Sequence, residues 1–151
     1  MAPAQEKVKS DDELPELESV VDMTTFNQIL EMDDPDDHSF SSSIVFDFFD
    51  QADQTFTEMD DALDAKDLFE LSAKGHFLKG SSATLGLVKV RDGCEKIQRY
   101  GKKENVDGTP EPDEALCLSR IEDVIKVVKD DISDARRVLT NYYDKKEKED
   151  A

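Results

Sequence analysis

The sequence predicts an all-α protein, an antiparallel four-helix bundle with a short extra helix near its N-terminal end. Two observations support this fold class. Apolar residues recur at alternating steps of three and four along four long stretches, which is the spacing of one helical face. No stretch shows a convincing strand pattern, and the five prolines lie outside the apolar stretches. Four such helices bury their apolar faces against one another around a single core.

The two ends of the chain are polar and charged. We expect residues 1–20 to be mostly disordered, because so acidic a segment buries too little apolar surface to offset the entropy of ordering. A small docking role for Leu14 and Leu17 is the less favoured alternative. Residues 21–145 then form the helical-bundle domain, and residues 146–151 form a flexible charged tail.

The first two helices follow the acidic segment. Asp22 is a suitable cap for a short helix over residues 23–32, and a run of aspartates with a proline ends it. A long helix then spans about residues 41–63, with Ser39 or Ser41 as its expected cap. Its apolar stripe alternates steps of three and four: Val45, Phe48, Ala52, Phe56, Met59 and Leu63.

Three connected helices complete the bundle. The next helix spans about residues 66–85 and ends at Gly86. The short turn there makes it antiparallel to a helix over residues 88–103. A loop over residues 104–112 leads to the longest helix, over residues 113–143. On the 88–103 helix, a second row at helical spacing lies beside the apolar one: Arg91, Glu95, Gln98 and Lys102.

Composition excludes several functions. The net charge is −18, so the chain should be repelled by nucleic acid and by anionic membrane surfaces. No apolar run approaches the roughly 20 residues of a membrane helix, and no signal peptide is recognisable. We expect a soluble protein of the cytoplasm and nucleus. Cys94 and Cys117 fall at apolar helix positions, which favours two buried thiols over a disulfide, and no metal-ligand spacing is present.

The 66–85 helix carries the residues that indicate chemistry. Beside its apolar stripe runs a second row on another face: Ser72, His76, Lys79, Gly80 and Ala83. A glycine inside a helix costs about 1 kcal/mol relative to alanine, and this helix holds Gly75 and Gly80. We interpret the pattern as a histidine left open to another protein.

Phosphate chemistry fits His76 better than the alternatives. No carboxylate lies one turn away to make an acid–base pair, and no second metal ligand follows at the next turn. A neutral imidazole is a nucleophile, and Lys79 one turn on would place positive charge near phosphoryl oxygens. From the residues alone, a surface histidine without a role stays open as the alternative.

The run H-F-L-K-G-S-S-A-T-L-G at residues 76–86 resembles the signature of histidine-containing phosphotransfer (HPt) proteins. It is most similar to the single-domain phosphorelay intermediate of yeasts and moulds. Further matches lie at residues 32–34, 48–51 and 94–98, and together they span residues 24–143. The resemblance implies the same helical bundle that the periodicity predicts.

The resemblance also implies a relay. His76 would accept a phosphoryl group from a receiver-domain aspartate of a hybrid sensor histidine kinase. It would pass the group to the receiver-domain aspartate of a response regulator. The implied protein is a monomer that needs no cofactor of its own, with Mg²⁺ held by the partner receiver domain. It would be a phosphocarrier without autokinase activity.

The resemblance assigns roles to neighbouring residues as well. Gln98 matches a glutamine that hydrogen-bonds the active histidine, and Lys102 matches a basic residue that helps hold the phosphoryl group. Ser72, Lys79 and Gly80 complete the predicted support of His76. Exposed apolar residues would form the docking surface, with core packing as the alternative for each: Ile29, Met32, Phe40, Ile44 and Phe77.

Two other functions compete with the relay. The first is a fragment of a histidine kinase dimerisation domain, but those usually place an acidic residue directly after the histidine, where this chain has Phe77. The second is a helical-bundle adaptor without chemistry, for which His76 would be dispensable.

Overall fold

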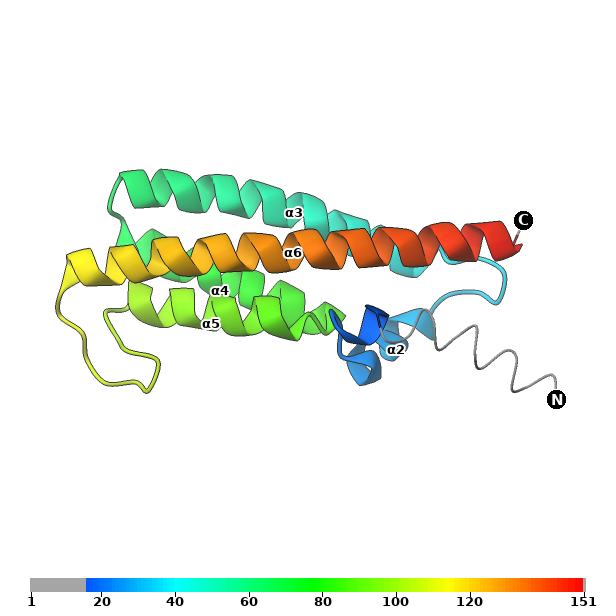
Figure 1. The fold of residues 1–151 in the computed structure, drawn as a ribbon, viewed down its shortest axis with the longest axis horizontal. Helices are drawn as coiled ribbons and strands as arrows, with labels where there is room; N and C mark the ends of the chain where they lie inside the picture. The colour runs from blue at the N-terminus through cyan, green and yellow to red at the C-terminus, as the bar shows by residue number, and fades with distance from the viewer. Residues whose placement is uncertain (1–15, 151) are drawn as a thin grey trace.

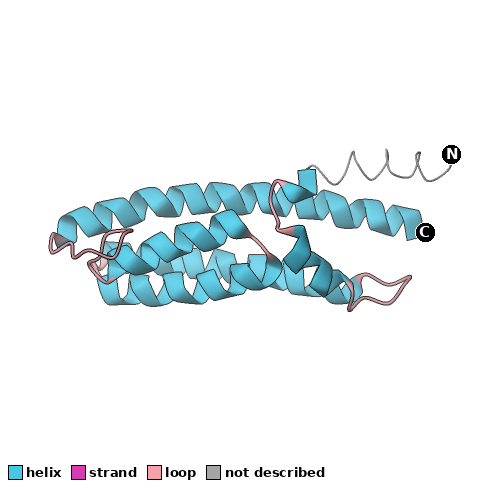
Figure 2. Ribbon diagram, turned by 90° about the horizontal axis from the view of Figure 1, so that it is seen from below, coloured by secondary structure: helices cyan, strands magenta, loops and turns pink. Residues whose placement is uncertain are grey.

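A computed structural model gives the structure of the chain and describes residues 16–150. Four long helices lie alongside one another, and a shorter helix crosses them near one end (Figure 1). No β-strand forms within the described range, and helices and loops account for all of it (Figure 2). The predicted all-α bundle is therefore confirmed. The helices are α2 (Met23–Leu30), α3 (Ser39–Asp64), α4 (Leu68–Leu85), α5 (Val88–Gly101) and α6 (Glu114–Asp150).

The helix boundaries follow from capping chemistry. The Asp67 carboxylate accepts a hydrogen bond from the Glu70 amide and begins α4. Gly86 ends α4 with a left-handed φ of 78°, as predicted, and its carbonyl accepts from the Asp22 amide at 2.7 Å. A Cβ on Gly86 would lie 2.8 Å from the Asp22 carbonyl oxygen. This turn therefore fixes α2 against the α4–α5 connection.

The expected caps of α3 were wrong. Neither Ser39 nor Ser41 caps the helix with its own hydroxyl. Instead, the Asp37 carboxylate accepts from the Ser39 amide at 2.9 Å, and the Asp33 carboxylate accepts from the Ser41 amide at 2.8 Å. A carboxylate is a stronger acceptor than a hydroxyl for these free amides, and its charge complements the helix dipole.

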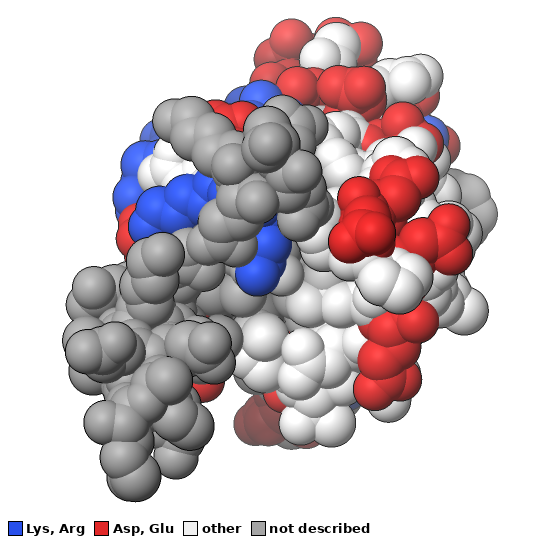
Figure 3. All heavy atoms as spheres, turned by 90° about the vertical axis from the view of Figure 1, so that its right-hand side faces the viewer, with Lys and Arg blue, Asp and Glu red and all other residues white. Residues whose placement is uncertain are grey.

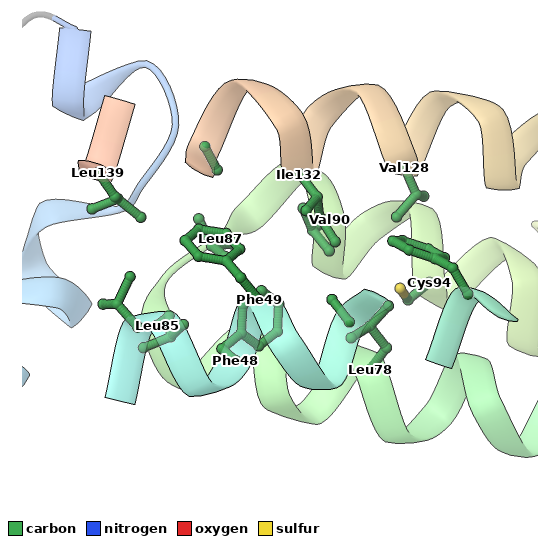
Figure 4. Close-up of a cluster of buried hydrophobic side chains, with 14 of the residues drawn as sticks. Phe48, Phe49, Leu78, Leu85, Leu87, Val90, Cys94, Val128, Ile132 and Leu139 are labelled. Atoms are coloured by element: carbon green, nitrogen blue, oxygen red, sulfur yellow. The ribbon is translucent and has the colours of Figure 1, made fainter. Parts of the chain in front are cut away.

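The predicted apolar stripes meet in one core. Figure 4 shows side chains from α3, α4, α5 and α6 converging, among them Phe48, Leu78 and Ile132. Both cysteines are buried free thiols, as expected, and burial raises the pKa of Cys94 to about 12. Because the apolar face of α4 is packed into this core, the row of α4 that contains His76 faces away from it.

Both ends of the domain extend further than predicted. Leu17 is only 1% exposed and belongs to the core, and Glu16 pairs with Arg137 at 2.8 Å. Residues 16–20 are therefore not disordered, because Leu17 and Val20 pack against apolar residues of the bundle. Residues 1–15 of the predicted disordered segment, Leu14 included, lie outside the described residues. Helix α6 runs through Asp150 rather than ending near residue 143.

Two glycines bring α4 and α5 into backbone contact. A Cβ on Gly75 would lie 3.0 Å from both the Cys94 carbonyl oxygen and the Gln98 amide nitrogen. A Cβ on Gly101 would lie 2.8 Å from the Leu68 carbonyl oxygen and from the Ser72 amide nitrogen. These positions exclude side chains, since rigid backbone atoms of the facing helix occupy the space.

We expect Gly101→Ala to destabilise the fold by about 1 to 3 kcal/mol, because the added methyl group meets backbone atoms. Gly80→Ala is the matched control, since a Cβ there meets nothing within 4 Å. It should raise stability by up to about 1 kcal/mol through helix propensity. Urea unfolding of both variants measures the difference, and equal effects would contradict the packing role of Gly101.

Candidate functional site

His76 lies on the outward face of α4, and its side chain is exposed. Among the side chains that the structure describes, those of residues 16–146, none makes a hydrogen bond or an ion pair with its ring. The ring borders a groove of about 680 Å³ whose wall is built from α4, the end of α5 and the start of α6. The other lining residues are Leu68, Phe69, Ser72, Ala73, Gln98, Gly101, Lys102, Lys103 and Glu114.

Lys79 is hydrogen-bonded to α5 rather than directed at His76. Its Nζ donates to Glu95 Oε1 at 2.8 Å and to Gln98 Oε1 at 2.7 Å. Gln98 therefore uses its side-chain oxygen for Lys79, and the predicted hydrogen bond between Gln98 and His76 is absent. The charged ammonium is a strong donor and holds the Gln98 side-chain oxygen toward Lys79.

Glu95 is a site residue that the sequence analysis missed. Its Oε1 accepts from Lys79 and its Oε2 accepts from Arg99. The hydrogen bond from Lys79 is the main reason why the pKa of the Glu95 carboxyl lies below its usual value, and Arg99 adds to the effect. Arg99 also pairs with Glu104 at 3.5 Å. The sequence did contain an indication of this role, because Glu95 lies on the same row of α5 as the predicted site residue Gln98.

Lys102 is an unpaired cation beside His76. It lines the same groove as His76, and its side chain is exposed. In the part of the chain that the structure describes, its ammonium makes no ion pair and no hydrogen bond. Lys102 therefore has all three of its donors available to an anion at His76.

Ser72 supports the site through the fold rather than by contact with His76. Its side chain is buried, and its hydroxyl donates to the Gln98 backbone oxygen at 3.0 Å. That bond fixes α5 relative to the His76 row of α4. The two glycines also differ in role: Gly75 allows the helices to pack, whereas a side chain on Gly80 would extend into open space. Of these two glycines, Gly80 is therefore the one that packing within the chain does not require.

The five predicted docking residues divide into two groups. Met32, Phe40 and Phe77 are exposed, at 68%, 46% and 49% of their surface. Ile29 is only 8% exposed and belongs to the core, because α2 turns it inward. Its predicted place on the docking surface was wrong. Ile44 is partly buried against the core.

Phe69 is a second residue that the sequence analysis missed. It is 81% exposed and lines the groove beside His76. Its position just after the start of α4 places it outside the apolar stripe. Its exposed ring extends the apolar surface around the histidine.

A hydrogen-bonded chain anchors the segment between α2 and α3, which carries Met32. Tyr143 Oη donates to Ser41 Oγ at 2.8 Å, and the Ser41 hydroxyl donates to the Asp33 carboxylate. Burial raises the pKa of Tyr143, so it remains a neutral donor. Side chains of α3 and α6 thereby hold Met32 and Phe40 at the surface.

Charge is unevenly distributed over this end of the molecule. Figure 3 shows acidic side chains gathered on one side, basic ones on the other, and an uncharged area between them. Among residues 16–146, whose side chains the structure describes, no group of His, Cys, Asp and Glu is arranged to hold a metal ion. No helix in that range is long and apolar enough to cross a bilayer.

Comparison with known proteins identifies the family. Residues 43–138 match the Hpt domain. Multistep phosphorelay regulator 1 of Schizosaccharomyces pombe is 48% identical over 136 residues, which cover 89% of this chain and 46% of that protein. Phosphorelay intermediate protein YPD1 of Candida albicans is 47% identical over 65% of this chain and 54% of its own length. The chain thus spans about half the length of these curated relatives.

Solved structures agree with these matches. The crystal structure of yeast YPD1p superposes with a TM-score of 0.73 at 30% identity, covering 83% of this chain and 95% of that one. A co-crystal structure of Saccharomyces cerevisiae Ypd1 with the receiver domain of its downstream response regulator Ssk1 has the same TM-score and coverage, at 33% identity. The Hpt match covers more than half of the chain. The chain with its exposed His76 therefore belongs to the Hpt domain family.

Proposed function

We propose that this chain is a phosphorelay intermediate of multistep two-component signalling. His76 accepts a phosphoryl group from the receiver-domain aspartate of a hybrid histidine kinase and passes it to the receiver-domain aspartate of a response regulator. One observation carries the proposal: an exposed histidine without a hydrogen bond to the described chain lies beside the unpaired Lys102, within an Hpt domain. Such a ring is a nucleophile that another protein can reach.

The proposed transfer needs only a positioned ring nitrogen. Its lone pair attacks the phosphorus of the aspartyl phosphate, the bond from phosphorus to the aspartate oxygen breaks, and the carboxylate leaves. The other ring nitrogen keeps its proton, and the second transfer reverses these steps on a new aspartate. In this proposal Lys102, which lines the same groove as His76, stabilises the phosphoryl oxygens, and the acidic pocket of the receiver would hold Mg²⁺.

Docking would use the exposed apolar residues of the predicted docking surface. The Ypd1 protein of the co-crystal structure binds a receiver domain, and its resemblance to this chain supports a partner of the same kind here. Phe77, Met32 and Phe40 offer exposed apolar area for such a partner. One chain carries the whole proposed site, so a monomer is sufficient. As part of the proposal, the chain acts in the cytoplasm and nucleus and has no autokinase activity.

The relay predicts that His76 alone carries the label. A receiver domain phosphorylated with ³²P should transfer the label to the wild-type chain as an acid-labile, base-stable adduct. His76→Gln should take up none, because a carboxamide is not a nucleophile toward phosphorus. His38→Gln is the matched control, since it removes the other histidine of the chain, and it should label like wild type. If His76→Gln is labelled as strongly as wild type, or if wild type takes up no label from several receiver domains, the adaptor function explains the chain better than the relay does.

Gly80→Gln should separate stability from transfer. The new side chain enters open space, so the helix should be slightly more stable than with glycine. The same side chain occupies the surface beside His76 that a receiver must approach. We therefore expect the transfer rate to fall by about tenfold, equivalent to about 1.4 kcal/mol.

Ser133→Gln on α6 is the control for this variant, because it adds the same side chain at an exposed helical position away from His76. It should transfer at the wild-type rate. Equal transfer by Gly80→Gln and Ser133→Gln would remove Gly80 from the docking surface.

A further inference from the structure

The ammonium of Lys79, one turn from His76, is already neutralised within the chain. It donates to Glu95 at 2.8 Å and to Gln98 at 2.7 Å, so two of its three donors are in use. Glu95 in turn accepts from Arg99, and Arg99 pairs with Glu104. Positive and negative charges alternate along this network, and its sum is zero.

The network also places Lys79 in a different hollow from His76. Lys79 lines a hollow with Glu95, Arg99 and Glu104, whereas His76 lines the groove that extends toward Phe69. Gln98 and Lys102 border both. In this position the ammonium donates to side chains of α5, and neither of these hydrogen bonds goes to the ring of His76.

We propose that Glu95 is a positioning residue that holds Lys79 away from His76 in the unphosphorylated chain and releases it to the phosphoryl group once His76 is phosphorylated. This inference rests on the proposed function. A phosphoryl group carries up to about two negative charges, whereas Glu95 carries one, so it competes effectively for the ammonium. The Lys79–Glu95 pair is partly exposed, at 27% and 35% of the side chains, and such pairs are weak.

The release leaves no carboxylate unpaired. Glu95 keeps its hydrogen bond from Arg99 after Lys79 departs, because the two cations use different oxygens of the carboxylate. Gln98 has an uncharged side chain, which is only partly buried, so the loss of one hydrogen bond leaves no charge unpaired. Exchange of Lys79 between Glu95 and the phosphoryl group is therefore a local rearrangement that leaves the helices in place.

The first measurement tests the pairing without any phosphate. Titration of the Glu95 carboxyl by carbon-13 NMR should give a midpoint below the ordinary value of 4.5, and Lys79→Ala should move it upward. A depressed carboxyl pKa contributes stability that is present above the unfolded value and lost as pH falls through the folded one. The pair should therefore be intact at neutral pH. An unchanged midpoint in Lys79→Ala would overturn the inference.

The second measurement is the equilibrium constant for transfer between a purified phosphorylated receiver domain and the chain. Glu95→Gln should shift it toward phosphorylated His76 by about two- to fivefold, because the phosphoryl group no longer competes with a carboxylate for Lys79. Glu104→Gln is the matched control, since it removes the same charge from the same network without touching Lys79. It should leave the constant unchanged.

The decisive comparison is Glu95→Gln in a Lys79→Ala background. If Glu95 acts through Lys79, its substitution there should change nothing, whereas direct repulsion between Glu95 and the phosphoryl group would persist. A persistent shift, no shift in either background, or a shift toward the receiver overturns the inference. If the wild-type chain takes up the phosphoryl group, these outcomes count against the role of Glu95 alone. If the wild-type chain takes up none, the proposed function itself has failed. Urea unfolding of each variant checks that the fold is intact.

Discussion

The site depends on the backbone contact between α4 and α5. Gly75 and Gly101 leave no room for a side chain between the two helices, and the Ser72 hydroxyl binds the Gln98 carbonyl across the same seam. Side chains about one turn away from these glycines therefore come within hydrogen-bonding distance across the two helices. Lys79, four residues after Gly75, and Gln98, three residues before Gly101, are such a pair. A methyl group added at Gly75 or Gly101 would push α4 and α5 apart, which would disturb both the core and the pairing of Lys79 with Gln98. The arrangement of side chains around His76 is therefore a consequence of how the two helices pack.

The sequence was a good guide to the helices because their signals are local. Three-and-four spacing and the left-handed Gly86 depend on neighbours along the chain. Each predicted helix is present, and its ends lie within a few residues of those expected, except that α6 continues to Asp150. The errors lie where distant contacts decide. Leu17 is ordered because the bundle offers it an apolar site, and Asp33 caps α3 from eight residues before Ser41.

The site was predictable along one helix and not across two. Spacing on α4 placed Ser72, His76, Lys79 and Gly80 on one row, but spacing carries no information about which α5 residue meets Lys79. Gly75 and Gly80 look equivalent in the sequence. Only the atoms of the facing helix show that the first is enclosed and the second is open.

Two lysines beside one histidine raise a selectivity problem that the Glu95 network addresses. A pair of unpaired ammonium groups next to His76 would attract any small anion from solution, and a bound anion would obstruct the approach of a receiver. With Lys79 paired to Glu95 and Gln98, Lys102 is left in the groove without a partner in the described part of the chain. A singly charged anion then gains little by displacing a carboxylate that is already in place, whereas a phosphoryl group bonded to His76 carries more charge and is held within reach. In the proposed relay, covalent attachment to His76, rather than affinity for free phosphate, is thus the condition under which Lys79 moves to the phosphoryl group.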